Sequence, residues 1–350
     1  MKRRILFTLL LCTALLLALP AWATDEPEVL DPEEIDRLLE PYLEEYKVTE
    51  KNLGIAFLYT ATGETYFLHG EQHFYSASLY KVPLCMRYAE RISKGELDWS
   101  TQWKGSTMER MISRTLLYSD NSTAGGLIYM DNALLYGDNI FGLYSGYSEE
   151  AQNALGSDYQ FTPRYMLNTL RTLFEEPERF PRILDYMKDA APGEFFEEIL
   201  GDRYEIAQKY GQWNGVLHTA GVIYTPTPIL LVVMCDHLPQ QKEAISRLAE
   251  LFSDYSLTLD ERREAIHARE EEERRLAEEA AEAEKARIAE AERVKAEEAA
   301  RAAAEEAQRQ KVAGDAEAVS RRLLLEASGC FGIAFVLIFK AWQLRKKQFK

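Results

Sequence analysis

Three short polar segments of the chain contain residue types that can carry out nucleophilic chemistry. In the first, Phe74 to Leu84, Ser78 and Lys81 stand three residues apart. Residues i and i+3 share one face of a helix, so a helix that begins near Ser78 places the amine of Lys81 close to the hydroxyl. A serine hydroxyl needs an adjacent base to become a nucleophile. A lysine can be that base when burial or a nearby cation lowers its pKa.

The other two segments follow in order along the chain. Ser119, Asp120 and Asn121 come at the end of a helical pattern, and Lys209, Tyr210 and Gly211 lie in a strand-like run. The Ser-x-x-Lys spacing is common by chance, and a serine at a helix start usually only caps the helix. Three such segments in one order are a much more specific signal.

This ordered set of motifs resembles the class A β-lactamases and penicillin-binding serine hydrolases, members of the DD-peptidase superfamily. The resemblance runs from the first helix of the globular part to its last. It implies an α+β fold, in which an antiparallel five-stranded sheet is flanked by helices and accompanied by a helical subdomain. It implies a serine hydrolase with no metal and no organic cofactor.

The resemblance also implies a role for each matching residue. Ser78 is expected to be the acylated nucleophile, Lys81 the base or proton relay, and Ser119 a proton shuttle to the leaving nitrogen. Backbone N–H groups of Ser78 and Gln212 are expected to bind the oxyanion. The substrate-binding set is Asn121, Lys209, Tyr210, Gly211 and Gln212, in which Asn121 binds the side-chain amide and Lys209 attracts the carboxylate. Asp120 is expected to orient its loop.

Several positions depart from the family pattern. Tyr210 stands where the family usually has Thr or Ser, so a phenol replaces a short hydroxyl, and Thr219 stands where Asp is common. No clear Glu-x-x-Leu-Asn follows Asn121, although this glutamate positions the deacylating water in class A enzymes. The nearest match begins at Glu149 and Glu150. We interpret these two residues either as the deacylation group or as part of a solvated acidic loop.

The elements that must position these motifs can be read from hydrophobic periodicity. Residues 31–46 form an amphipathic pattern, and 54–59 and 64–68 flank a turn signal. A mostly helical section follows from about 78 to 200. Three strand-like runs come next, at 204–212, 216–225 and 229–236, and a closing helix covers 240–252. The absence of βαβ alternation favours an antiparallel sheet packed against helices.

Both ends of the chain have the features of targeting or membrane segments. Residues 1–23 combine a basic start, an apolar run and an Ala-x-Ala site, which predicts a signal peptide; an uncleaved anchor is the alternative. Residues 321–342 are apolar enough for a transmembrane helix, with an amphipathic docking helix as the alternative. The basic tail 343–350 predicts a cytoplasmic end. We therefore expect a single-pass protein of the bacterial cell membrane whose globular domain, 25–258, is extracytoplasmic.

Composition limits the remaining possibilities. The 350 residues have a formal charge of −16, which argues against a nucleic-acid partner. Residues 259–313 are rich in Ala, Glu and Arg and predict a solvated helical stalk, about 75 Å long if continuous. The stalk lacks an a/d heptad, which argues against a strong coiled coil and leaves self-association of the stalk open. The alternative is a low-complexity tail.

Cys85 and Cys235 fit small core residues, with a mutual disulfide left open.

The expected function is that of a secreted, membrane-tethered serine hydrolase. It forms an acyl-enzyme at Ser78 with β-lactams or peptidoglycan peptides, and hydrolysis is slow if no glutamate activates water. Such an enzyme acts on the cell wall or confers antibiotic resistance. The alternative is a non-catalytic peptidoglycan-binding or sensory module that uses the same groove.

Overall fold

The computed structural model describes residues 29–131, 142–148 and 159–347. The chain divides into two compact units, Met1–His267 and Ala268–Lys350. The motifs that could carry chemistry all belong to the first unit. The predicted signal peptide, together with Glu149 and Glu150, lies outside the described residues.

The first unit is built on a five-stranded sheet in which every neighbouring pair is antiparallel. The strand order is β2-β1-β9-β8-β7, so β7 is an edge strand. The strands are β1 (Leu53–Tyr59), β2 (Thr65–Leu68), β7 (Ile206–Trp213), β8 (Val216–Ile223) and β9 (Ile229–Asp236). The α+β fold with a five-stranded antiparallel sheet, as predicted from the sequence, is therefore confirmed.

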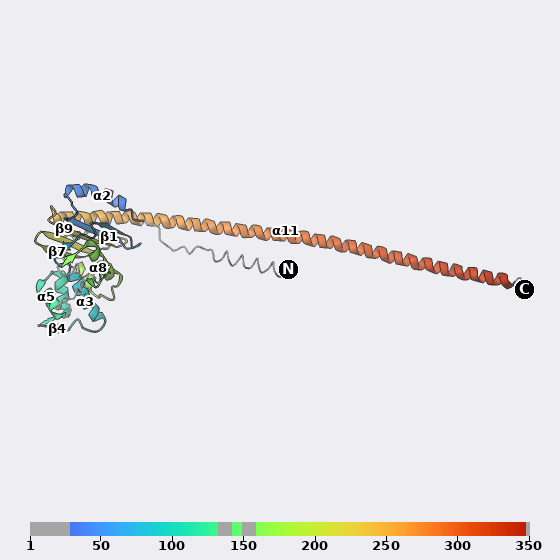
Figure 1. Cartoon of the computed structure of the whole chain (residues 1–350), viewed down its shortest axis with the longest axis horizontal. Helices are drawn as coiled ribbons and strands as arrows, with labels where there is room; N and C mark the ends of the chain where they lie inside the picture. The colour runs from blue at the N-terminus through green and yellow to red at the C-terminus, as the bar shows by residue number, and fades with distance from the viewer. Residues whose placement is uncertain (1–28, 132–141, 149–158, 348–350) are drawn as a thin grey trace. The chain divides into compact units, whose positions relative to one another are not determined.

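Helices cover both faces of this sheet (Figure 1). On one face lie α2 (Pro32–Glu45) and the first turns of α11 (Gln241–Lys347), with Ile35, Leu39 and Phe252 in one apolar cluster. On the other face lie α3 (Lys81–Ser93) and α8 (Pro163–Glu175), whose apolar side chains form a second cluster. Because both faces are covered, β1 is buried along its whole length and reads as a continuous apolar run.

The helical section between β2 and β7 carries two of the three polar motifs. Its remaining helices among the described residues are α4 (Met108–Leu117), α5 (Asn121–Met130), α9 (Ile183–Lys188) and α10 (Phe196–Leu200). Two small two-stranded sheets brace it, β3 (Phe74–Tyr75) with β6 (Gln160–Phe161) and β4 (Gln102–Trp103) with β5 (Ser106–Thr107). The short β3 strand leads directly into the segment that contains Ser78.

The start of α3 differs from the sequence-based expectation. The α-helix begins at Lys81, not near Ser78. The preceding residues form successive i→i+3 turns, in which the Leu79 N–H bonds to Ser76 and the Lys81 N–H bonds to Ser78. Such turns are common at helix N-termini, and they still bring residues three apart together. The expected proximity of Ser78 and Lys81 therefore survives the shift of the helix boundary.

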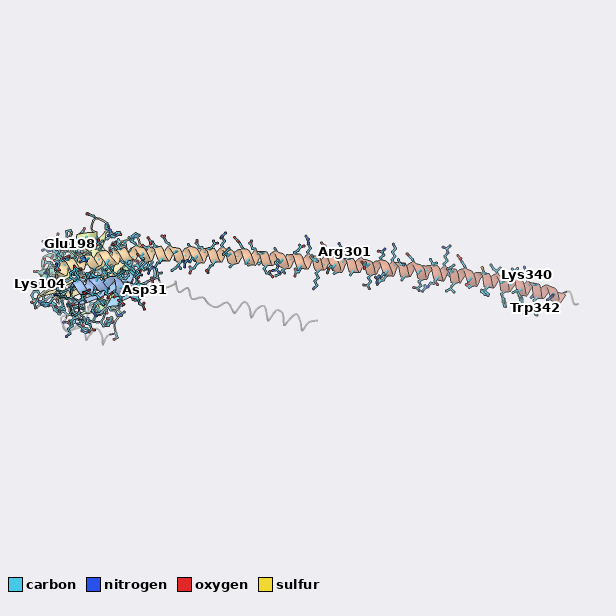
Figure 2. The ribbon with its side chains drawn as sticks, turned by 90° about the horizontal axis from the view of Figure 1, so that it is seen from above. Asp31, Lys104, Glu198, Arg301, Lys340 and Trp342 are labelled. Carbon is cyan, nitrogen blue, oxygen red and sulfur yellow. The ribbon has the colours of Figure 1, made fainter. Side chains whose placement is uncertain are left out.

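Helix α11 is unbroken from Gln241 to Lys347, so the closing helix, the stalk and the apolar segment are parts of one helix. The absence of Gly and Pro between 240 and 313 permits this continuity. In the second unit its charged side chains, such as Arg301, project into solvent (Figure 2). Within the described part of the chain, α11 alone is long and apolar enough to cross a membrane.

Gly221 tests how tightly the sheet is packed beside the site. A Cβ at this position on β8 would lie 2.3 Å from the carbonyl oxygen of Ala207, a backbone atom that cannot turn aside. We expect Gly221→Ala to lower the free energy of unfolding by about 1–3 kcal/mol, measured by thermal melting of the full chain in detergent. Gly125→Ala, in a helix with open space around it, is the control and should melt no earlier than wild type. Equal melting temperatures for Gly221→Ala and wild type would contradict this packing.

Candidate active site

Ser78 and Lys81 meet at the start of α3. The Lys81 Nζ donates to the Ser78 Oγ at 3.1 Å. Lys81 is fully buried, whereas Ser78 is half-buried. The hydroxyl is thus open to a ligand while the amine beside it is screened from water.

Ser119 lies in the short connection between α4 and α5, with a left-handed backbone (φ 52°). Its neighbour Asp120 caps α5 by accepting from the N–H groups of Ser122 and Thr123. The Arg114 guanidinium binds the second oxygen of this carboxylate through two donors, at 3.0 and 2.8 Å. Asp120 thereby holds the connection in place, as a loop-orienting residue does.

Lys81 binds this connection through three further contacts. Its Nζ donates to the Ser119 carbonyl oxygen at 2.6 Å, to the Ser119 Oγ at 3.2 Å and to the Asn121 Oδ1 at 2.7 Å. The two hydroxyls of Ser78 and Ser119 are therefore bridged by one amine. The sequence predicts that these residues meet, and in the structure they lie within hydrogen-bond distance of the Lys81 Nζ.

Lys209 reaches the same cluster from edge strand β7. Its Nζ donates to the Ser119 Oγ at 3.0 Å and to the Tyr210 carbonyl oxygen at 2.7 Å. The side chain is fully buried. The Ser119 hydroxyl consequently accepts from two lysines and is the link between them.

Gly211 allows β7 to approach the segment that carries Ser78. A Cβ at this position would lie 2.9 Å from the Ser78 backbone nitrogen and 3.0 Å from the Ser76 carbonyl oxygen. Only a residue without a side chain leaves these backbones in contact. The next residue on β7 is Gln212, which is exposed.

Burial dominates the electrostatics of the two lysines. Desolvation lowers the pKa of Lys81 to about 8, and it lowers that of Lys209 to about 7 with a further contribution from the positive charge of Lys81. Among the described residues, no carboxylate accepts a hydrogen bond from either amine. At neutral to mildly alkaline pH a substantial fraction of each amine is unprotonated, and Lys81 can then accept the Ser78 proton.

Other predicted residues lie apart from this cluster or have different surroundings. The Tyr210 ring is half-buried and stacks on Phe195, a contact that sequence reasoning missed because residues 194–205 carry no recognisable motif. The deacylation candidates Glu149 and Glu150 lie outside the described residues. Within the described ranges, no group of three His, Cys, Asp or Glu side chains could hold a metal ion.

His218 has a structural environment. Its Nδ1 accepts from the Cys235 N–H at 3.1 Å, so the proton is on Nε2, which donates to the Tyr75 carbonyl oxygen at 2.8 Å. Full burial lowers the pKa of His218 to about 4, and the ring stays neutral. Cys85 and Cys235 are both buried and free, so no disulfide joins them.

Comparisons with known proteins show the family of the chain and proteins that share its fold. The family model for the β-lactamase enzyme family matches residues 33–256. A β-lactamase from Xanthomonas campestris is 21% identical, with a TM-score of 0.53, over 63% of this chain and 98% of its own. A β-lactamase from Chitinophaga pinensis is 17% identical, with a TM-score of 0.52, over 64% and 99%. An ancestral class A β-lactamase is 19% identical, with a TM-score of 0.53, over 62% of this chain and 99% of its own. No curated protein matches significantly in sequence.

Burial of Lys209 predicts a pH-dependent stability. Its pKa is about 7 in the folded chain and about 10.5 when unfolded, so the unfolded state binds more protons between these values and stability rises with pH there. Lys209→Met removes this contribution. We expect its gain in unfolding free energy from pH 7 to pH 9 to be about 2 kcal/mol smaller than that of wild type. Thermal melting of the full chain in detergent at both pH values measures it.

The exposed Lys51 provides a matched control. Lys51→Met should keep the pH dependence of the wild type, because the Lys51 side chain is exposed and the change leaves the buried Lys209 in place. A Lys209→Met variant with the same pH dependence as wild type would show that Lys209 is not deprotonated by burial.

Proposed function

Because the chain belongs to the β-lactamase enzyme family, we propose that it is a serine hydrolase that forms an acyl-enzyme at Ser78 with β-lactams or peptidoglycan peptides. One observation carries the proposal: Lys81, an amine with a lowered pKa, lies within 3.1 Å of the Ser78 hydroxyl and 3.2 Å of the Ser119 hydroxyl. A base in contact with both a nucleophile and a proton shuttle is the arrangement that acyl transfer needs.

In the proposed acylation, unprotonated Lys81 takes the Ser78 proton as Oγ forms a bond to the substrate carbonyl carbon. Negative charge develops on the carbonyl oxygen, where the N–H groups of Ser78 and Gln212 act as donors, each worth about 3–4 kcal/mol in comparable sites. The carbon–nitrogen bond then breaks. The Ser119 hydroxyl gives its proton to the leaving nitrogen and recovers one from Lys81. Asn121 binds the substrate side-chain amide, and Gly211 lets β7 lie close enough for these contacts.

The positive charge of Lys209 supports this proton transfer through Ser119. Its hydrogen bond to the Ser119 Oγ stabilises that oxygen while it has lost its proton. Burial keeps the proton affinity of Lys81 low. The aromatic ring of Tyr210 lies against the Lys209 amine on one side of the proposed site.

For deacylation we propose that Glu149 or Glu150 activates the water. Their segment keeps the outer Glu and Asn of the class A pattern but has Gln in place of Leu. We therefore propose that acylation is fast relative to deacylation, as in a penicillin-binding protein.

We further propose how the chain is placed in the cell. Residues 1–23 direct export, 25–258 form the extracytoplasmic hydrolase, 259–313 act as a spacer, 321–342 cross the bacterial membrane once, and 343–350 stay in the cytoplasm. The apolar part of α11 supports this proposal. Extracytoplasmic placement gives the hydrolase access to the cell wall.

The first prediction of this proposal is a covalent adduct. The full chain incubated with a labelled penicillin should gain the mass of one penicillin, because opening the lactam ring leaves every atom on the enzyme. Ser78→Ala should gain none, and Lys81→Ala should react about 10²–10⁴ times more slowly for lack of its base. Intact-protein mass spectrometry measures both. Ser93→Ala, exposed on the same helix α3, is the control. Absence of an adduct on wild type at high concentration would leave a binding module without chemistry.

The second prediction concerns turnover. With a chromogenic cephalosporin, we expect a burst that matches the amount of enzyme, followed by a slow steady phase limited by deacylation. If a glutamate activates the water, Glu149→Gln or Glu150→Gln should keep the burst and slow the steady phase about 10²-fold or more. Stopped-flow absorbance separates the two phases. A steady phase unchanged in both variants would show that another group activates the water.

A further inference from the structure

A loop beside the site is held in a defined conformation by buried side chains. The Gln208 amide accepts from the Phe196 N–H at 3.2 Å and donates to the Ala190, Ala191 and Glu194 carbonyl oxygens at 3.0–3.3 Å. The Ser246 Oγ of α11 donates to the Phe195 carbonyl oxygen at 2.8 Å. These contacts fix residues 190–196 and place the Phe195 ring.

Phe195 in turn fixes the ring of Tyr210. The two rings stack with centroids 4.9 Å apart and planes at 22°. Phe195 is 4% exposed, so its ring cannot swing away without opening the packing on that face of the sheet. Tyr210 is consequently a rigid aromatic wall next to Lys209.

The same ring covers the ammonium group of Lys209. The Lys209 Nζ lies 4.3 Å from the centroid of the Tyr210 ring, within the range of a cation–π contact. Its other partners are the Ser119 Oγ and the Tyr210 carbonyl oxygen. The protonated amine has three N–H donors, which two hydrogen bonds and one ring face satisfy, and the neutral amine has two, which the two hydrogen bonds use.

A substrate carboxylate would therefore find no free donor on Lys209, which is fully buried. The Tyr210 hydroxyl, which stands in place of a short Thr or Ser hydroxyl, forms no hydrogen bond with the described residues. It lies at the far end of a ring that is held by stacking, so it cannot reproduce a hydroxyl carried on Cβ. Tyr210 therefore alters both groups that would bind a substrate carboxylate: it covers the Lys209 amine, and it replaces the short Thr or Ser hydroxyl.

We propose that the Phe195–Tyr210 pair is a specificity determinant that frees the site from any need for a carboxylate beside the scissile bond. The substrate class then extends to acyl donors whose leaving group is uncharged, such as amidated peptides. This inference rests on the proposed function, because it describes the selectivity of acylation at Ser78. Lys209 acts through Ser119 rather than by direct contact with the substrate.

Two thioesters with one shared acyl group test the proposal. One has mercaptoacetate as leaving group and the other its N-methylamide, so they differ only in a carboxylate. In either reaction the Ser78 oxygen bonds to the acyl carbon, the carbon–sulfur bond breaks, and the Ser78 proton ends on the departing thiol. A thiol reagent follows release, and the ratio of acylation rate constants, carboxylate over amide, is the measured quantity.

For the full chain in detergent we expect a ratio within about threefold of one. In Tyr210→Thr the ratio should rise about tenfold or more, because a hydroxyl and a Lys209 N–H become available to a carboxylate and such charged hydrogen bonds are strong. Tyr210→Phe should keep the ratio near one, since the aromatic ring, and not its hydroxyl group, keeps a carboxylate from Lys209. Phe195→Ala should raise the ratio by less than Tyr210→Thr does, because it removes the ring on which Tyr210 stacks and leaves Tyr210 free to move. Tyr204→Thr, the same substitution just before β7, is the control.

A binding measurement keeps this test independent of chemistry. On the Ser78→Ala background, phenylacetylglycine, a small carboxylate, should bind at least fivefold more tightly when Tyr210→Thr is added. Failure of that gain, or a wild-type ratio above tenfold in favour of the carboxylate, would overturn the proposal. If neither thioester acylates wild type, the proposed function fails, while the binding result still decides the role of Tyr210.

Discussion

The Lys81 amine is surrounded by four oxygen acceptors that carry no formal charge. The ability of Lys81 to lose its proton depends on these uncharged surroundings. A carboxylate in hydrogen-bond contact would keep the amine protonated, whereas hydroxyl, carbonyl and amide oxygens solvate it without offsetting the cost of burial. The Asp120 carboxylate is nearby, but Arg114 and the N-terminus of α5 bind it. The lysine is thus left as a weak acid that can lose its proton.

The fold maintains this condition through the edge strand β7. Gly211 lets the strand lie against the Ser78 backbone, and Lys209 then brings a second buried amine to the Ser119 hydroxyl. Two amines that share one hydroxyl each disfavour the charge of the other. The left-handed backbone of Ser119 is sparsely populated for such a residue and is held by the capped start of α5. The strained backbone of Ser119 and the two buried lysines therefore cost folding free energy, which the packing of the surrounding sheet and helices must offset.

Most of the fold and the central cluster could be predicted from the sequence, for physical reasons. Strands such as 229–236 have a clear apolar run, and Ser78, Lys81, Ser119 and Lys209 are residue types whose spacing has chemical meaning. The start of α3 was misplaced because i→i+3 turns and α-helix have the same local pattern. The Phe195 contact could not be predicted, since it depends on a loop fixed by long-range hydrogen bonds of Gln208 and Ser246. The assignment of Glu149 and Glu150 stays a prediction.

The last part of α11 has a consequence for how the protein can be handled and released. Large apolar side chains between Leu323 and Trp342 are exposed along the described helix, Phe331 by 79%. Left in water, such a surface drives self-association or uptake by micelles and lipid. The hydrophilic helix before it, residues 268–320, is exposed along its whole length. A single cut in this helix would separate the apolar end from the compact unit, which keeps all of Ser78, Lys81, Ser119 and Lys209 and would then lack this apolar surface.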